Sequence, residues 1–312
     1  MAADGVRIPV ILDTDIGTDV DDIMALAVLL RAPEIDLRAI TTVYGNAALR
    51  ARIVKAVLAT AGRLDVPVGC GVDWPLVVRG STYWGGWEGD GILGAEDEPA
   101  EALPYAVDLI ADLLLADPGA VTIVAVGPLT NLALAIAREP RVAGSVRRIV
   151  IMGGVVQRRF DQLADPYVEH NIRCDPEAAQ LVLASGAPIT LVPLDVTTQV
   201  RVRRSDLAGL AGDGLAALVA DQVDRYLRLI GRDWTSPHDP LAASLLLHPE
   251  FVQTHRMHVS VETRGEMTRG QTVATMSGAG GQGRPVLDVA LSVDAPAFEA
   301  WLLPCLAGVS RA

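Results

Sequence analysis

Short apolar runs rich in β-branched residues alternate along the chain with longer stretches in which apolar positions recur at helical spacing. The first run covers residues 8–13, and a helical pattern follows from about residue 20 to residue 31. A last helical region spans about residues 213–248, with a break at residues 234–237. Between them we predict strands at residues 37–43, 121–126, 148–152 and 189–193, and helices at residues 47–61, at residues 129–138 and from residue 175 onward.

This alternation is typical of the α/β class. It predicts an open, mostly parallel, doubly wound sheet with helices on both faces. Because no Ser- or Pro-rich linker and no internal repeat interrupts the pattern, we expect residues 1–312 to form a single domain. Ligands of such sheets bind beyond the carboxyl ends of the strands. Residues 71–99 form a long aperiodic segment, and segments of this kind are usually functional.

The composition supports a large core and argues against two kinds of partner. Half of the residues are hydrophobic, and the formal net charge is −12. Nucleic-acid binding requires a footprint of lysine and arginine, so this charge argues against it. The most apolar stretch, residues 121–137, contains Gly127, Pro128 and Asn131, so we expect no membrane span.

The cysteines and the first residues favour a cytoplasmic location. The three cysteines are odd in number and far apart, so neither a disulfide framework nor a CxxC site is expected. Residues 1–8 contain no long apolar segment of the kind found in export signals.

An acidic segment directly after the first predicted strand carries the main chemical signal. Its ten residues, DTDIGTDVDD, include five carboxylates: Asp13, Asp15, Asp19, Asp21 and Asp22. Capping and the dipole of the next helix explain Asp19, Asp21 and Asp22, but not the other two. Like charges this close repel one another unless a cation binds. Because the ligands are all oxygen, Ca²⁺ or Mg²⁺ is favoured over zinc.

Phosphatases of the haloacid dehalogenase type also place a DxD at the end of their first strand. They normally carry Thr or Val where this chain has Gly17, and the second acidic pair has no role in that interpretation. A phosphatase is therefore the weaker alternative.

Four further motifs follow in order, and together with the acidic segment they carry a family resemblance. They are Gly45-Asn46, Leu129-Thr130-Asn131, Met152-Gly153-Gly154 followed by Glu169-His170-Asn171, and His238-Asp239. In this set the chain resembles the inosine-uridine preferring nucleoside hydrolases, over most of its length. The resemblance implies hydrolysis of the N-glycosidic bond of ribonucleosides to ribose and a free purine or pyrimidine base.

The resemblance also implies roles for individual residues. The metal would be Ca²⁺, and its ligands would be Asp15, Asp22, Asp239 and the main-chain carbonyl of Thr130. The catalytic groups would be Asp15 as base, Asn46 positioning the water and His238 as the acid for the leaving base. The ribose would be bound by Asp21, Glu169 and Asn171.

Aromatic side chains are the candidates for stacking on the base. By location they are Trp87 and Tyr226 first, then Trp84, Trp234 and Tyr83.

Two departures from the family pattern leave alternatives open. Thr18 and Asp19 are additional in the acidic motif, so either Asp19 or Asp21 is the third acidic group of the site. The family's Asn for the sugar 5′-hydroxyl is missing before Glu169, and Gln157, Asp161 or Gln162 would have to replace it. These departures keep open a nucleoside- or sugar-binding protein without catalysis. Relatives are often dimers or tetramers, which implies a homodimer or homotetramer.

Overall fold

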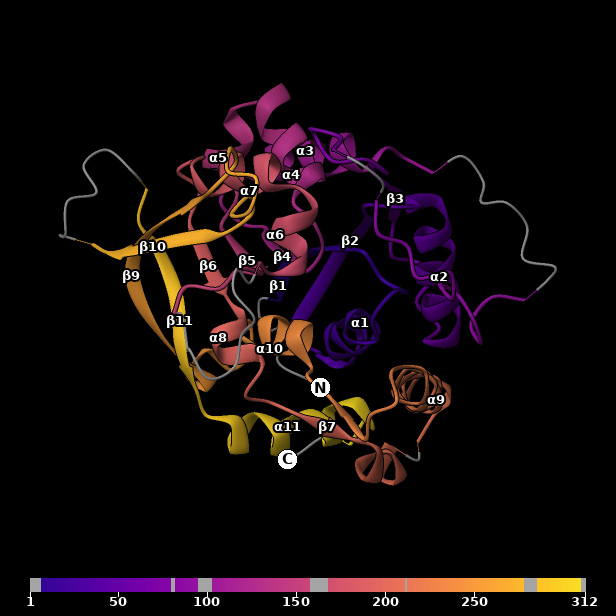
Figure 1. Cartoon of the computed structure of the whole chain (residues 1–312). Coiled ribbons are helices and arrows are strands. Elements are labelled where there is room, and N and C mark those ends of the chain that lie inside the picture. The colour runs from indigo at the N-terminus through magenta and orange to yellow at the C-terminus, as the bar shows by residue number, and fades with distance from the viewer. Residues whose placement is uncertain are drawn as a thin grey trace.

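Nine of the described strands form one sheet, which crosses the centre of the molecule (Figure 1). The computed structural model describes residues 7–79, 82–94, 103–157, 168–210, 212–277 and 285–309. Across the sheet, the strands are β10 (Thr272–Met276), β9 (Val252–Val261), β11 (Leu287–Val293), β6 (Ile189–Val192), β5 (Arg148–Met152), β4 (Thr122–Ala125), β1 (Ile8–Thr14), β2 (Ile35–Thr42) and β3 (Val68–Cys70). Neighbours from β11 to β3 run parallel, whereas β9 is antiparallel to β10 and β11. The predicted open, mostly parallel sheet is confirmed.

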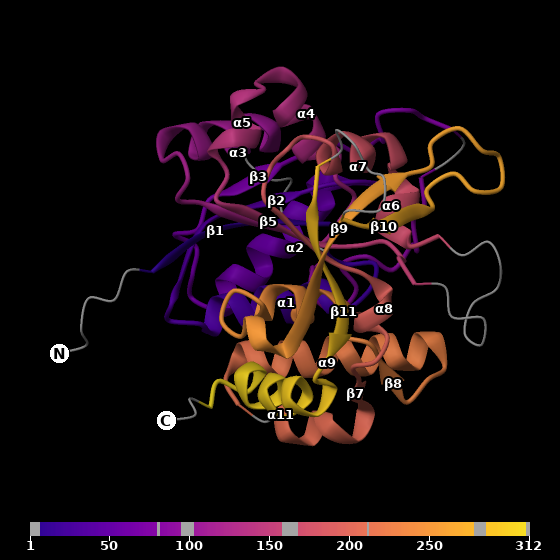
Figure 2. The same cartoon turned by 90° about the vertical axis from the view of Figure 1, so that its left-hand side faces the viewer.

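Helices cover both faces of the sheet, as Figures 1 and 2 show. One layer contains α3 (Ala106–Ala116), α4 (Thr130–Arg138), α5 (Arg141–Ser145) and α7 (Pro176–Leu183). The other contains α1 (Asp21–Arg31), α2 (Ala47–Thr60), α8 (Leu194–Thr197), α9 (Gly214–Ile230), α10 (His238–Ser244) and α11 (Ala295–Leu306). A short helix, α6 (His170–Cys174), follows the loop after β5. No helix in these described ranges is long and apolar enough to cross a bilayer.

Each helical layer buries its own apolar cluster against the sheet. Successive residues of a strand point to opposite faces, so Val10 and Leu12 of β1 belong to one cluster and Ile11 to the other. All three side chains are fully buried, and burial of each contributes about 1.5–3 kcal/mol. This explains why the central strands read as continuous apolar runs rather than as alternating ones.

The predicted elements are present, with shifts of a few residues at their ends. The expected break at residues 234–237 contains β8 (Trp234–Thr235), which pairs with β7 (Val202–Arg203) and separates α9 from α10. Two short helical turns, η1 (Arg204–Leu210) and η2 (Pro249–Phe251), complete the described elements. β3 and β10 are among the strands that the sequence pattern did not predict. Both are edge strands, and β10 buries none of its five residues, so neither carries the apolar signature of the central strands.

Candidate active site

The loops that leave β1 and β4 meet at the carboxyl edge of the sheet, where the acidic segment begins. The amide of Val126 donates a hydrogen bond of 2.8 Å to the carbonyl of Asp13. Directly after it, Gly127 packs against Asp15, and a Cβ at this glycine would lie 2.9 Å from the Asp15 nitrogen and 3.0 Å from its Oδ1. Only glycine allows the two loops to approach this closely.

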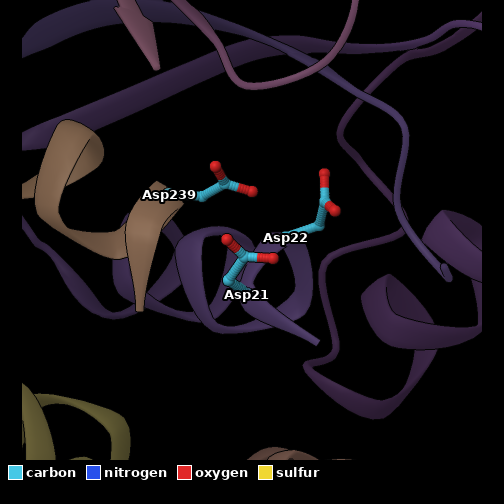
Figure 3. Close-up of side chains that lie close together, drawn as sticks. All are labelled: Asp21, Asp22 and Asp239. Carbon is cyan, nitrogen blue, oxygen red and sulfur yellow. The ribbon is translucent and has the colours of Figure 1, made fainter. Parts of the chain in front are cut away.

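Three buried carboxylates gather beside this edge. Asp21 and Asp22 open α1, and Asp239 lies in the first turn of α10, which packs against α1. Their side chains point toward a common space (Figure 3), and one oxygen from each lies within 4.8 Å of the others. The structure thus joins groups more than 200 residues apart in the sequence. Asp21, which we had expected to bind ribose, is part of this cluster.

Burial and mutual repulsion make this cluster unstable as three bare negative charges. Burial, followed by the charges of neighbouring aspartates, raises the pKa of Asp21, Asp22 and Asp239 well above the ordinary carboxyl value. The charge of Asp15 contributes to all three shifts, so this residue lies close to the cluster, although it is not one of its three members. A divalent cation would relieve the repulsion, and a donor set made only of oxygen suits Ca²⁺ or Mg²⁺.

A buried arginine holds the acidic loop in place through hydrogen bonds to its main chain. Arg50, on α2, is only 1% exposed. Its guanidinium donates hydrogen bonds to the main-chain oxygens of Tyr44, Asp15 and Ile16 and to the hydroxyl of Thr18. Its charge also lowers the pKa of Asp22, against the larger effect of burial. Arg50 was not among the site residues predicted from the sequence. The available signal was an arginine among apolar positions of a predicted helix.

Two further polar groups hold the strand ends in place. The carboxylate of Asp13 accepts hydrogen bonds from Thr41 (2.6 Å) and Asn131 (2.8 Å), and burial raises its pKa to about 7. The hydroxyl of Thr130, at the start of α4, donates to Asp175 (2.7 Å). Asp13 and Asn131 are therefore positioning residues, and Thr130 is held rigidly with its side chain turned to Asp175.

Glu169 and Asn171 tie α6 to the ends of β4 and β5. The Glu169 carboxylate accepts hydrogen bonds from the amides of Gly154 (3.0 Å), Asn171 (2.7 Å) and Ile172 (3.0 Å). The Asn171 amide donates to the carbonyl of Val126 (2.7 Å). Both side chains are buried and immobilised, so they have a structural role in addition to any contact with a sugar.

The two remaining catalytic candidates sit at helix starts. Asn46 is exposed and caps α2, and its side chain accepts a hydrogen bond of 2.9 Å from the amide of Leu49. His238 is the first residue of α10, and its Nδ1 lies 2.7 Å from the hydroxyl of Thr197. Burial lowers the pKa of His238 to about 4, so the ring is neutral at neutral pH.

A cavity of about 420 Å³ brings together the two favoured aromatic residues. Trp87 and Tyr226 both line it, together with Asp19. The phenol of Tyr226 donates to Asp19 (2.7 Å), and the indole of Trp87 donates to the carbonyl of Thr18 (2.9 Å). The two extra residues of the acidic motif thus belong to this cavity, while Asp21 rather than Asp19 joins the carboxylate cluster.

The other aromatic candidates lie elsewhere. Trp84 and Tyr83 line a second cavity of about 540 Å³, and the Arg50 guanidinium lies 5.2 Å from the Trp84 ring centre. Trp234 lies on β8, where Arg201 covers its ring at 4.5 Å. Arg201 thus occupies one face of the Trp234 ring, and Trp234 lines neither of the two cavities.

Only one of the three expected substitutes for the missing Asn can be placed. The Gln157 side chain is exposed, and the main-chain amide of Gln157 donates a hydrogen bond of 2.6 Å to the Asp195 carboxylate. Asp161 and Gln162 lie outside the described residues.

Comparison with known proteins identifies the family. The sequence model of the inosine-uridine preferring nucleoside hydrolases matches residues 10–300. The chain belongs to this nucleoside hydrolase family. It is therefore an enzyme, a hydrolase of nucleosides, and the phosphatase interpretation of its acidic motif loses its basis.

Sequence relatives of this nucleoside hydrolase cover nearly its whole length. It is 36% identical to the non-specific ribonucleoside hydrolase RihC of Escherichia coli O1:K1, over 96% of this chain and 99% of the relative. It is also 36% identical to an uncharacterised protein of Schizosaccharomyces pombe, over 85% of this chain and 88% of that protein.

Solved nucleoside hydrolases share the fold. A purine-preferring ribonucleoside hydrolase from Gardnerella vaginalis superimposes with a TM-score of 0.85 at 28% identity, over 96% of this chain and 98% of the other. A plant nucleoside hydrolase gives 0.81 at 29% identity, over 96% and 99%. The doubly wound fold predicted from the sequence is thus the fold of this enzyme family.

Proposed function

We propose that this enzyme is a Ca²⁺-dependent hydrolase that cleaves the N-glycosidic bond of ribonucleosides to ribose and free base. The observation that carries the proposal is the group of three buried carboxylates, Asp21, Asp22 and Asp239. A group of this kind is stable only if it is protonated or if it holds a cation, and its position at the carboxyl edge of the sheet is where ligands of this fold class bind.

The residues fit a calcium ion. Asp22 and Asp239 would be ligands, with Asp15 or Asp21 and the main-chain carbonyl of Thr130 completing the protein's share. Calcium accepts six to eight oxygen ligands in a flexible geometry, which suits adjacent carboxylates that differ in direction. A bound Ca²⁺ would supply a contact for the ribose diol and lower the pKa of a water molecule.

Side chains of the protein would position the water and the sugar and accept the proton. Asp15, fixed by the Arg50 contact to its main chain, would accept the proton of the attacking water, and Asn46 would orient that water. Glu169 and Asn171 would contact the sugar, and the surrounding carboxylates would stabilise the positive charge that develops on it.

The leaving base would stack on the aromatic side chains of the cavity lined by Trp87 and Tyr226. His238 would assist departure of the base. If the Thr197 hydroxyl donates to Nδ1, the N–H of the neutral ring is on Nε2, where it can donate a hydrogen bond to the negative charge that develops on the leaving base.

The test is a panel of purine and pyrimidine nucleosides assayed with Ca²⁺ and with a chelator. We expect release of ribose that stops with the chelator and returns with Ca²⁺, and much slower cleavage of 2′-deoxynucleosides. His238→Ala should lose activity on natural nucleosides while keeping it on a ribosyl substrate whose leaving group needs no proton. Tight nucleoside binding without turnover would indicate a binding protein on the same scaffold.

We also propose a single domain covering residues 1–312, a homodimer or homotetramer, and a cytoplasmic location. The first is supported by the two apolar clusters that share one sheet. Light scattering of the purified protein would test the oligomeric state.

A further inference from the structure

The larger cavity has a basic rim, which is unusual in a protein with a net charge of −12. Arg79, Arg173 and Arg269 all line this cavity of about 540 Å³. They come from three separate parts of the chain: the segment after β3, the α6 helix and the turn before β10. Because three guanidinium groups line the same cavity, positive electrostatic potential is concentrated there.

Two of these arginines have no acidic partner among the described residues. Arg79 and Arg173 are exposed, and neither forms an ion pair within the described ranges. Arg269 pairs with Glu177, which offsets one positive charge. Within the part of the chain that the structure describes, the rim therefore retains positive charge that can meet a ligand.

The floor of the cavity does not cancel this charge. It is formed by Tyr44 and Cys174. Burial raises the pKa of the Cys174 thiol to about 12 and that of the Tyr44 phenol further still, so both groups are neutral at neutral pH. Tyr44 is also the one non-glycine residue of the described chain with a left-handed backbone, at φ 69°. Arg50 and the amide of Tyr83 hold it there by hydrogen bonds.

The cavity and the sugar-binding candidates share the α6 helix, which is capped by Glu169 and carries Arg173 and Cys174 of the cavity lining. The charges of Asp15 and Glu169 both act to raise the pKa of the Cys174 thiol, so the lining lies close to the site residues. Cys174 Sγ lies 3.4 Å from the His170 ring, and Tyr83 meets that ring edge-on at 5.6 Å between centres. His170 stands between Glu169 and Asn171 in the sequence, and α6 is about 6 Å long from first to last residue. This short separation along α6 places the cavity lining within reach of a substituent on a substrate held at the proposed sugar site.

We infer that this cavity receives an anionic group carried by the substrate, either a phosphate on the sugar or a carboxylate on the base. The inference rests on the proposed nucleoside hydrolysis and adds a substrate class to it. Planar, forked guanidinium groups are the side chains best suited to both anions. The aromatic lining and the neutral floor leave the arginines as the main determinant of selectivity.

The kinetic test compares each charged substrate with its neutral partner. Inosine 5′-monophosphate against inosine tests a phosphate on the sugar, and orotidine against uridine tests a carboxylate on the base. In the double variant Arg79→Gln, Arg173→Gln, kcat/KM for the recognised anionic substrate should fall by about 25-fold, about fivefold for each arginine, while the neutral partner changes less than about twofold. Comparing enzyme variants on one substrate cancels the intrinsic reactivity of that substrate.

Arg141→Gln is the matched control. Arg141 lies on α5, before the amino end of β5, and so at the opposite edge of the sheet from the site. It should leave every kcat/KM unchanged. If neither anionic substrate loses more than its neutral partner in the double variant, the inference is wrong.

A binding measurement separates failure of this inference from failure of the proposed function. Calorimetry with ribose 5-phosphate, with orotate and with ribose needs no turnover. Binding of one anion that is lost in the double variant supports the cavity even if no nucleoside is cleaved. Cleavage of neutral nucleosides without any arginine-dependent binding of either anion overturns the inference and leaves the proposed function intact.

Discussion

Replacing Asp239 by asparagine should stabilise the metal-free protein while it removes the response to calcium. Two unit charges at 4.8 Å, the upper limit of separation in the carboxylate cluster, repel by about 3.5 kcal/mol at an effective dielectric constant of about 20. Asp239 faces two such partners, Asp21 and Asp22. Protonation limits the penalty, because neutralising a carboxyl with an ordinary pKa of 3.8 at neutral pH requires about 4 kcal/mol.

Asparagine keeps the shape of the side chain and removes the charge. Its buried amide loses about 1 kcal/mol or more if it lacks a full set of partners. The free energy of unfolding in chelator should therefore rise by about 1–3 kcal/mol. With Ca²⁺ at about 100 times its dissociation constant, the wild type should gain about 2.7 kcal/mol, and the variant should gain almost nothing.

Urea denaturation with chelator and with Ca²⁺ measures both effects. Asp213→Asn is the control, since Asp213 is an exposed carboxylate and asparagine can still cap α9. It should keep the calcium response. An Asp239→Asn protein that is less stable than the wild type in chelator, and that still responds to Ca²⁺, would refute the electrostatic reasoning.

Three other changes test separate parts of the structure. Arg50→Met should lower the free energy of unfolding by about 3–5 kcal/mol and weaken Ca²⁺ binding, because buried carbonyl groups lose their hydrogen-bond donor. Urea denaturation measures the stability and calorimetry the Ca²⁺ binding. A loss of stability below about 1 kcal/mol would contradict the anchoring role of Arg50. Arg31 holds the pKa of Asp213 at about 2, below its ordinary 3.8, so this ion pair stabilises the fold above about pH 4 and its contribution disappears as the pH falls toward 2. The exposed pair is worth less than about 1 kcal/mol, so Asp213→Asn and the wild type should differ slightly at pH 5 and converge only as the pH falls through about 2 in urea denaturation. Trp87→Phe should raise KM by about three- to tenfold with little change in kcat, since it removes a hydrogen bond that orients the ring but leaves the catalytic groups unchanged. A change confined to kcat would contradict a role of Trp87 in binding the base.

The local pattern was sufficient for the central strands and for the acidic motif. Strands such as β1 and β4 are buried on both faces, so their sequences are continuously apolar and easy to recognise. Edge strand β10 lacks that signature, because none of its five residues is buried, so its sequence did not predict a strand. The acidic motif was interpretable because five carboxylates in ten residues repel one another without a cation, a consequence of spacing along the chain alone.

The sequence by itself determined the α/β class, the family and the set of residues at the strand ends. Only the tertiary structure decided which of them meet. It placed Asp239 against Asp21 and Asp22, turned Asp19 toward Tyr226 and buried Arg50 behind the acidic loop. The physical reason is that local pattern reports periodicity and propensity, whereas the distance between two charges far apart in the sequence depends on how α1, α2 and α10 pack on the sheet.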